Sequence, residues 1–299
     1  MSQRQTQQPQ PITTLTYHID NQPYSIKTIC HPQSQLSLLQ SQQPTPEAIN
    51  IYASGASIEQ VDFSIQRCQT PAIFVNGSIT LTEKHSFSQI YAYVITDARF
   101  VQNGLDVLRQ HYQGQPLYLT QPVLEALITH LPNLVTQYHT RICVIFAVDR
   151  PLLPPPDSLW QKLCSKWLEK RKRIALEQIQ NSFAFVIESQ HTPVLGVSLD
   201  IRHGFVEAGT VAYVACQLAF SMGSTAIHIF GVDLLNHNQP RFYESPQKNA
   251  PCKLDKAIYN RIAPSFALLA TTYAQHQVSI YNHSPISKDL LTGLIYADD

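Results

Sequence analysis

The sequence has 299 residues, of which 44% are hydrophobic and 14% are charged, and its formal net charge is zero. This length and composition suit one large domain or two modest ones, and they exclude a chain that is disordered beyond its ends. A neutral chain with few charges gives no indication of nucleic-acid binding, so any basic patch would have to be local.

The first part of the chain, residues 1–48, begins with a Gln-rich tail. Two short apolar runs follow at residues 15–19 and 24–29, and their spacing around a polar turn predicts a small hairpin. A second stretch rich in Gln, Ser and Pro, residues 33–46, predicts a linker before the core begins near residue 49.

From residue 49 on, short apolar runs alternate with longer amphipathic ones. The expected strands are residues 49–53, 72–75, 90–96, 117–120, 142–148, 183–187, 226–230 and 278–282. The expected helices are residues 101–112, 122–131, 159–180, 210–222 and 254–275. This alternation predicts the α/β class, with a Rossmann-like, mainly parallel sheet flanked by helices.

A proline-rich segment, residues 149–157, interrupts the alternation. Because prolines stiffen the chain and stop a helix, we expect a boundary here. Residues 49–149 would form a nucleotide-binding half and residues 183–299 a second half that completes the site. Residues 150–182 would form a small helical lid or a membrane-proximal insertion.

The expected helix in this insertion combines basic and aromatic side chains. They are Trp160, Lys166, Trp167, Lys170, Arg171 and Arg173. Basic residues attract anionic lipid, and tryptophan inserts at the interface, so the helix predicts reversible membrane attachment. The alternative is a solvated helix that packs its tryptophans on the domain.

Small and polar residues follow several of the expected strands. They are Ser54, Gly55 and Ser57 after the first core strand, Asn76 and Asp97 after the next two, and Gly231 and Asp233 after residues 226–230. The carboxyl ends of parallel strands share one edge of a sheet, where α/β proteins bind ligands. The pattern therefore predicts one shared ligand site, and the alternative is a set of unrelated helix caps and turns.

Three further groups could serve this site. Thr210 begins a helix of small residues, and a hydroxyl with free amides at a helix N-terminus suits a nucleotide. Arg241 and Tyr243 follow Asp233 in a polar loop that could fold over a departing phosphate, although an ordinary loop would look the same. Asp200 and His203 belong to a dense titratable cluster, for which a salt-bridged surface turn is the alternative.

Several motifs are absent from the sequence. The six cysteines include no CxxC and no pairing with His at metal-ligand spacing, and DxD-like pairs at strand ends, GxSxG and HExxH are missing. We therefore expect reduced cysteines, no metal and no cofactor. No apolar run reaches the ~20 residues of a membrane span, and the N-terminus lacks a signal-peptide pattern, so we expect a cytoplasmic location.

The order and spacing of these motifs resemble known families over roughly residues 49–285. The motifs are Phe74-Val-Asn-Gly-Ser78, Val94-Ile-Thr-Asp-Ala-Arg-Phe100, Val197-Ser-Leu-Asp-Ile201, Gly231-Val-Asp-Leu234 and Arg241-Phe-Tyr243. These motifs resemble those of the bacterial lipopolysaccharide core proteins that add a third Kdo sugar (3-deoxy-D-manno-octulosonic acid). A less close resemblance, to the CMP-sialic acid sialyltransferases of glycosyltransferase family 42, rests on residues 53–64, Val75-Asn-Gly77, Thr210 and Gly231-Val-Asp233.

The resemblance implies a variant Rossmann-like glycosyltransferase that uses a CMP-activated keto-sugar acid without an essential metal. By similarity, CMP would be held by Ser54, Gly55, Asn76, Thr210 and Asp233, with the donor sugar towards Asp97 and Tyr243. The implied partners are CMP-Kdo, a lipid A-core oligosaccharide acceptor and the inner-membrane surface, where the enzyme would be peripheral.

The chain departs from the sialyltransferase pattern at the residue that would act as the general base. The sialyltransferases' catalytic histidine has no counterpart, because residues 249–261 contain no His. For the base we therefore expect Asp97 or Asp200, with His203 third, and for the phosphate we expect Tyr243 and Arg241.

Two other functions stay open. One is a sialyltransferase or another CMP-nonulosonate transferase on the same scaffold. The other is a non-catalytic CMP-sugar-binding or assembly protein that has kept the pocket and lost the base.

Overall fold

The computed structural model describes residues 11–34, 36, 45–155, 173–235, 240–244 and 257–298. Within these residues a 10-stranded sheet has the order β1-β2-β7-β6-β5-β4-β3-β10-β11-β12, and β8 and β9 form a separate 2-stranded sheet. The strands are β1 (Thr14–Ile19), β2 (Gln22–Thr28), β3 (Ala48–Tyr52), β4 (Ala72–Val75), β5 (Ile90–Ile95), β6 (Leu117–Thr120), β7 (Ile142–Ile145), β8 (Phe185–Glu188), β9 (Leu195–Ser198), β10 (Ala226–Phe230), β11 (Ser279–Asn282) and β12 (Ile295–Tyr296).

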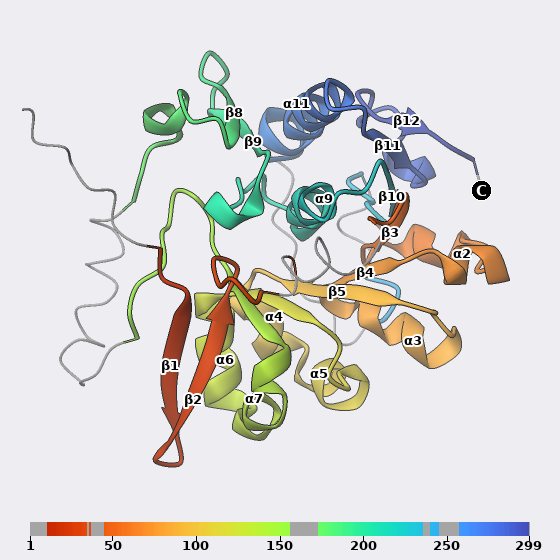
Figure 1. The fold of residues 1–299 in the computed structure, drawn as a ribbon. Coiled ribbons are helices and arrows are strands. Elements are labelled where there is room, and N and C mark those ends of the chain that lie inside the picture. Colours follow the sequence, from red (N-terminus) through yellow and green to blue (C-terminus); the bar gives the residue numbers. More distant parts are fainter. Residues whose placement is uncertain are drawn as a thin grey trace, which may run out of the picture.

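Helices cover both faces of the large sheet (Figure 1). One face carries α4 (Ala98–Asn103), α5 (Leu105–His111), α6 (Gln121–His130) and α7 (Pro132–Tyr138), and the other carries α9 (Val211–Ser221) and α11 (Ala263–Ala274). The remaining helices are short: α2 (Ile65–Gln69), α3 (Leu81–Lys84), η1 (Ala56–Gln60), η2 (Asn76–Thr80), η3 (His139–Arg141), η4 (Leu176–Ile179), η5 (Ile201–His203), η6 (Ile258–Ile262) and η7 (Pro285–Ser287).

The two faces follow from the alternation of side chains along each strand. In β4, Ile73 and Val75 pack in the same core cluster as α9 and α11, whereas Phe74 packs in the cluster on the other face. All three side chains are buried, as expected for a parallel strand covered on both sides. The predicted α/β fold with a mainly parallel sheet is confirmed.

The order of the strands changes direction at β3, in the interior of the large sheet. From β3 the chain adds β4, β5, β6 and β7 on one side, and α9 then brings it back so that β10 pairs with the other side of β3. Crevices at such reversals, at the carboxyl ends of the strands, are where open α/β sheets bind ligands. The reversal therefore singles out the loops after β3 and β10.

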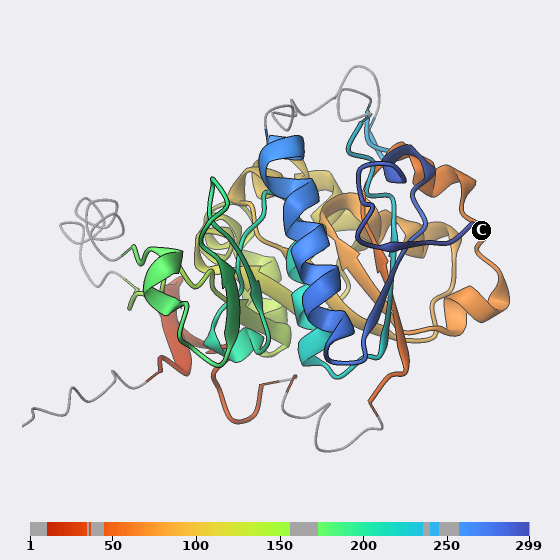
Figure 2. The same cartoon turned by 90° about the horizontal axis from the view of Figure 1, so that it is seen from above.

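Some expected elements take a different form. The predicted helix 101–112 is divided into α4 and α5 at Gly104, and the predicted strand near residues 183–187 pairs with β9 outside the main sheet. Figure 2 shows this small sheet beside α11, to which it is tied by a 2.9 Å hydrogen bond from the Tyr273 hydroxyl to the Ser198 carbonyl. The N-terminal hairpin forms, and β2 joins the main sheet through parallel pairing with β7.

Residues 156–172, which hold most of the predicted helix 159–180, lie outside the described residues, and these include Trp160, Lys166, Trp167, Lys170 and Arg171. The described end of this segment contradicts the prediction, because residues 173–175 form no helix and only the short 3-10 helix η4 follows. Arg173 is described and is exposed. In the described part of the chain, no helix combines the length and the apolar character needed to cross a membrane.

Candidate functional site

The loops after β3 and β10 run side by side beyond the ends of the two strands. The Ala53 N–H donates to the Phe230 carbonyl and the Gly55 N–H donates to the Gly231 carbonyl, both at 2.8 Å. The pairing of the strands thus continues into the loops, which places Gly55 against the turn that carries Asp233.

Asp233 holds the two loops together. Its Oδ2 accepts a 2.7 Å hydrogen bond from the Ser57 N–H, and its Oδ1 accepts a 2.5 Å bond from the Ser57 hydroxyl. A Cβ at Gly55 would lie 2.5 Å from Asp233 Cγ and 2.6 Å from the Gly231 carbonyl oxygen, so only glycine fits here. The predicted contact residues Gly55, Ser57, Gly231 and Asp233 therefore form one cradle.

The pKa of Asp233 gives a test of this arrangement. Burial raises it above its ordinary value, and the two Ser57 hydrogen bonds oppose the increase only in part. The native state then binds a proton more readily than the unfolded state. We expect the free energy of unfolding of the wild type, measured relative to Asp233→Asn, to rise as the pH falls from neutral towards ~4. Denaturant titrations across this range would contradict the arrangement if the difference stayed constant or fell.

The loop after β4 adds a second wall. Asn76 adopts a left-handed backbone conformation with φ of 50°, and its carbonyl accepts a 2.7 Å hydrogen bond from the Tyr93 hydroxyl. Asn76 Oδ1 is buried and has no hydrogen-bond partner among the described residues. The next residue, Gly77, lies directly against the ring of Tyr243, which occupies the space that a Cβ would take.

Residues 240–244 lie over these loops. The Phe242 N–H donates to the Ser54 carbonyl at 3.4 Å, and Arg241 makes a 2.7 Å ion pair with Glu244. The Tyr243 hydroxyl is buried and makes no hydrogen bond of ordinary geometry with the described residues, although the Arg241 charge lies near it. Burial raises the pKa of Tyr243 to about 12, so this hydroxyl is protonated at neutral pH and can donate to a ligand.

The hydroxyls that support the Asp233 turn lie at the far end of the sequence and were not predicted. Ser284 Oγ accepts from the Val232 N–H, and Ser287 Oγ accepts from the Leu234 N–H, both at 2.8 Å. Both serines are fully buried. Their position just after the strand β11 is the same signal that singled out Ser54 and Asn76.

Thr210 begins α9, the helix that leads into β10. Its hydroxyl accepts from the Ala212 N–H at 3.4 Å and so serves as the N-cap. Because α9 leads through a short turn into β10, a parallel strand of the large sheet, its C-terminus lies at the amino edge of that sheet and its N-terminus towards the carboxyl edge. Among the residues that the structure describes, no hydrogen bond joins Thr210 to the Asp233 cradle.

Asp97 lies at the same carboxyl edge of the large sheet, and its carboxylate is bound by Arg99. Both of its oxygens accept from the Arg99 side chain, and Oδ1 also accepts from the Arg99 N–H at 2.9 Å. Burial alone would raise the pKa of Asp97, but the hydrogen bonds and charge of Arg99, with a contribution from Arg241, hold it below its ordinary value. Asp97 is thus the N-cap of α4, and a carboxylate bound in this way is a weak base.

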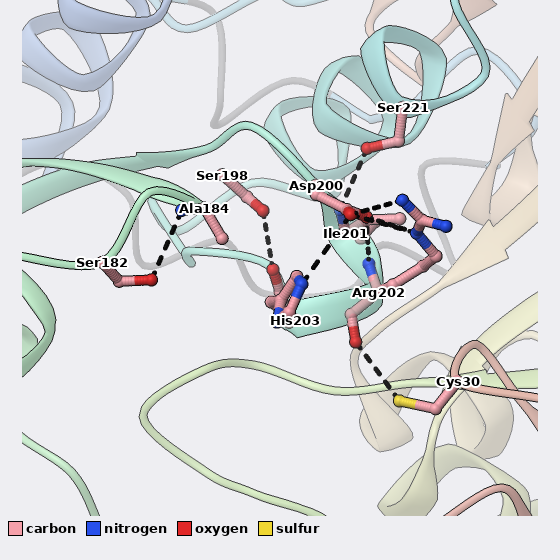
Figure 3. Close-up of polar contacts among 10 residues, drawn as sticks. Cys30, Ser182, Ala184, Ser198, Asp200, Ile201, Arg202, His203 and Ser221 are labelled. Atoms are coloured by element: carbon pink, nitrogen blue, oxygen red, sulfur yellow. Dashed lines mark hydrogen bonds and ion pairs between the residues drawn. The ribbon is translucent and has the colours of Figure 1, made fainter. Parts of the chain in front are cut away.

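Asp200 repeats this arrangement at a different place (Figure 3). Both of its oxygens accept from Arg202, and the neighbouring Ile201 N–H donates to Ser221 Oγ at 3.0 Å. Ser221 is the last residue of α9, whereas Thr210 precedes the first. Asp200 and His203 therefore lie at the opposite end of α9 from Thr210, and the structure does not bring them to the predicted site.

This placement predicts the result of a substitution. Asp200→Asn is expected to change turnover by less than about threefold, because a polar change remote from the site alters stability by only a few tenths of a kcal/mol. Steady-state rates for this variant and the wild type would decide the matter. A loss of a hundredfold or more at unchanged stability would return Asp200 to the reaction.

Within the described ranges, no group of three or more His, Cys, Asp or Glu side chains is placed to hold a metal ion. The four cysteines of this part of the chain, Cys30, Cys68, Cys143 and Cys216, are free.

Curated proteins that are similar to this chain in sequence include two from enteric bacteria. A probable 3-deoxy-manno-octulosonic acid transferase of Salmonella typhimurium is 24% identical over 247 residues, which cover 82% of this chain and 83% of the relative. A protein of the same description from Escherichia coli is 24% identical over 236 residues, covering 78% of this chain and 76% of the relative.

The solved structures that are similar include the sialyltransferase CstII of Campylobacter jejuni in complex with cytidine-5'-monophosphate, at 14% identity, with a TM-score of 0.43 and coverage of 85% of this chain and 86% of that one. The sialyltransferase CST-II with a trisaccharide acceptor and CMP is 14% identical, with a TM-score of 0.39 and coverage of 84% and 86%. The model of the 3-deoxy-D-manno-octulosonic acid transferase WaaZ family matches residues 31–291, and the chain therefore belongs to this family of Kdo glycosyltransferases.

Proposed function

We propose that the chain transfers Kdo from CMP-Kdo to a sugar of the lipid A-core oligosaccharide. Membership of the Kdo transferase family supports the identity of the transferred sugar. The resemblance of the motifs around Ser54, Asn76 and Asp233 to those of CMP-sugar transferases supports CMP as its carrier. The alternative is a donor that carries another nonulosonate, and CMP-sialic acid is therefore tested beside CMP-Kdo.

One observation carries the position of the site. The loops after β3, β4 and β10 meet where the strand order reverses, and two buried polar atoms there, Asn76 Oδ1 and the Tyr243 hydroxyl, lack ordinary hydrogen bonds within the described residues. Buried polar groups are paired in the great majority of cases. A ligand with polar groups on its surface, such as a nucleotide sugar, would supply the missing partners.

The residues divide into two roles in this proposal. Ser54, Gly55, Gly231 and Asp233 would form the wall against the nucleoside, as the resemblance of their motifs to those of CMP-sugar transferases implies. Arg241 and the protonated Tyr243 hydroxyl would contact the phosphate, which gains negative charge as CMP leaves. The N-terminus of α9 at Thr210 would add its dipole on the same side.

We place this reaction at the cytoplasmic surface of the inner membrane, with the enzyme attached peripherally. The lipid-linked acceptor supports this location, and so does the basic segment around Arg173 with its two tryptophans. Binding to vesicles with and without anionic lipid would measure it, and equal binding to both would contradict an electrostatic attachment.

The experiment for the function has two stages. Thermal unfolding with CMP, CMP-Kdo analogues and CMP-sialic acid should show stabilisation of ~2.7 kcal/mol at ligand concentrations about 100 times the Kd. Incubation with CMP-Kdo and a lipid A-core acceptor should then yield an acceptor heavier by one Kdo. No stabilisation by CMP would contradict the nucleotide site, and stabilisation without product would indicate a binding protein.

A further inference from the structure

A transferase that activates an acceptor hydroxyl needs a base with an oxygen open to the substrate. Three carboxylates near the proposed pocket do not offer one. Asp97 and Asp233 have both oxygens engaged by Arg99 and Ser57, and Glu244 is only 9% exposed with both oxygens bonded to Arg241.

Glu207 lies in a different setting, on the segment that leads from η5 into α9. Two residues before it, Phe205 is joined to the chain after β7: its N–H donates to the Phe146 carbonyl at 2.9 Å, and its carbonyl accepts from the Val148 N–H at 2.8 Å. Three residues after it, Thr210 caps α9. Glu207 is thus held between the carboxyl end of β7 and the start of the helix proposed to face the phosphate.

The backbone around Glu207 is fixed by two further side chains. The buried amide of Gln217 accepts from the Val206 N–H at 3.0 Å and donates to the Val206 carbonyl at 2.9 Å. Arg261, which lies on η6, donates to the Glu207 carbonyl at 2.5 Å. Segments distant in sequence therefore hold this peptide rigidly, as a residue that must meet a substrate at a defined position requires.

The Glu207 side chain is partly open to solvent, with 39% of its surface exposed. Its Oε2 pairs with the Arg150 guanidinium, and Oε1 has no bond with the described residues. The Arg150 ion pair would orient the carboxylate, while Oε1 stays available to accept a proton. This combination of one anchored oxygen and one open oxygen distinguishes Glu207 from Asp97.

We propose that Glu207 is the general base of the transfer, an assignment that rests on the proposed function. A bond forms between the acceptor oxygen and the anomeric carbon of Kdo, and the bond from that carbon to the phosphate oxygen breaks. Its electron pair leaves with CMP. The proton of the acceptor hydroxyl passes to Glu207 Oε1.

The spacing along the chain is compatible with this role. Three residues of extended chain span at most ~10 Å, which limits the separation of Glu207 from the N-cap of α9. Glu207 therefore lies within ~10 Å of the helix N-terminus at which the phosphate is proposed to bind.

The test compares Glu207→Gln with Glu59→Gln, which alters an exposed carboxylate two residues from Ser57. In Glu207→Gln, turnover should fall about 10²- to 10⁴-fold with the Kd for CMP and the melting temperature unchanged, whereas Glu59→Gln should retain wild-type turnover. The Glu207→Ala variant should regain part of its turnover in formate, which can replace a missing carboxylate base but cannot repair a merely structural defect.

The outcomes separate the two proposals. Near-normal turnover of Glu207→Gln, or a loss in Glu207→Ala that formate does not relieve, overturns the assignment of the base and leaves the proposed function standing. A loss in Glu59→Gln that formate relieves in Glu59→Ala would move the base to Glu59. A wild type that binds no CMP or transfers no Kdo overturns the function, and the assignment of Glu207 with it.

Discussion

Replacing Gly77 with alanine is expected to lower Kdo transfer about 100-fold, which is the size of effect seen when one group that stabilises a developing charge is displaced. The Tyr243 ring occupies the position of the new Cβ, so the ring must move away from residue 77. The displaced ring should also lower the free energy of unfolding by about 1–3 kcal/mol, the usual cost of overpacking. Steady-state kinetics and denaturant unfolding measure the two effects.

A double-mutant cycle shows whether the Tyr243 ring is the cause. Once Tyr243→Ala has removed the ring, adding Gly77→Ala should cost little further stability, because the overlap no longer exists. Tyr243→Phe is the matched control for the hydroxyl: it keeps the ring, and we expect it to reduce turnover without the loss of stability. Additive stability losses in the cycle would mean that Gly77 has another role.

Replacing Asp233 with alanine is the second change with a large expected effect. It removes both acceptors of Ser57, which is only 2% exposed, so the Ser57 N–H and hydroxyl lose their partner. An unpaired buried donor costs about 1–3 kcal/mol of stability. If the cradle holds the nucleoside, the affinity for CMP should fall roughly tenfold to 100-fold. Calorimetry with CMP and unfolding curves of the variant measure both quantities.

Ser57→Ala shows which role of Asp233 matters. If Asp233 only joins the two loops, Ser57→Ala should weaken CMP binding nearly as much as Asp233→Ala. If Asp233 also contacts the nucleotide, as the resemblance implies, Asp233→Ala should weaken it distinctly more. An unchanged CMP affinity in both variants would place the nucleotide elsewhere.

Much of the main sheet could be predicted from the sequence because its central strands are buried on both faces and read as short apolar runs. Residues 117–120 and 226–230 match β6 and β10 at both ends. The division of the predicted helix at Gly104 depends on a single glycine, against which the Phe100 ring packs. Periodicity does not reveal such a break, since the apolar pattern continues through it.

The arrangement of the strands could be predicted less well. An apolar run at residues 183–187 looks like any other strand, and only the pairing with β9 excludes it from the large sheet. Asp200, one of the predicted candidates for the base, is affected in the same way, because the sequence does not show to which sheet the preceding strand belongs. Asp200 follows an apolar run as Asp97 does, but that run is β9, which belongs to the separate two-stranded sheet.

Nothing in the sequence singles out Glu207. It follows no predicted strand, and no motif includes it. Its position depends on pairing between Phe205 and Ala147 and on Arg261. Such contacts between distant segments cannot be read from local patterns.

The pairing of β3 with β10 has a consequence for how the protein folds. Ile49 aligns with Ile227, so the two loops of the Asp233 cradle come from segments that are separated by most of the chain. Closing so long a loop is slow compared with joining β3 to β4, which are near neighbours in sequence. The binding cradle should therefore be completed late, and recovery of CMP binding during refolding should lag behind the formation of helices. Simultaneous recovery in stopped-flow measurements would show that the two ends of the chain meet early.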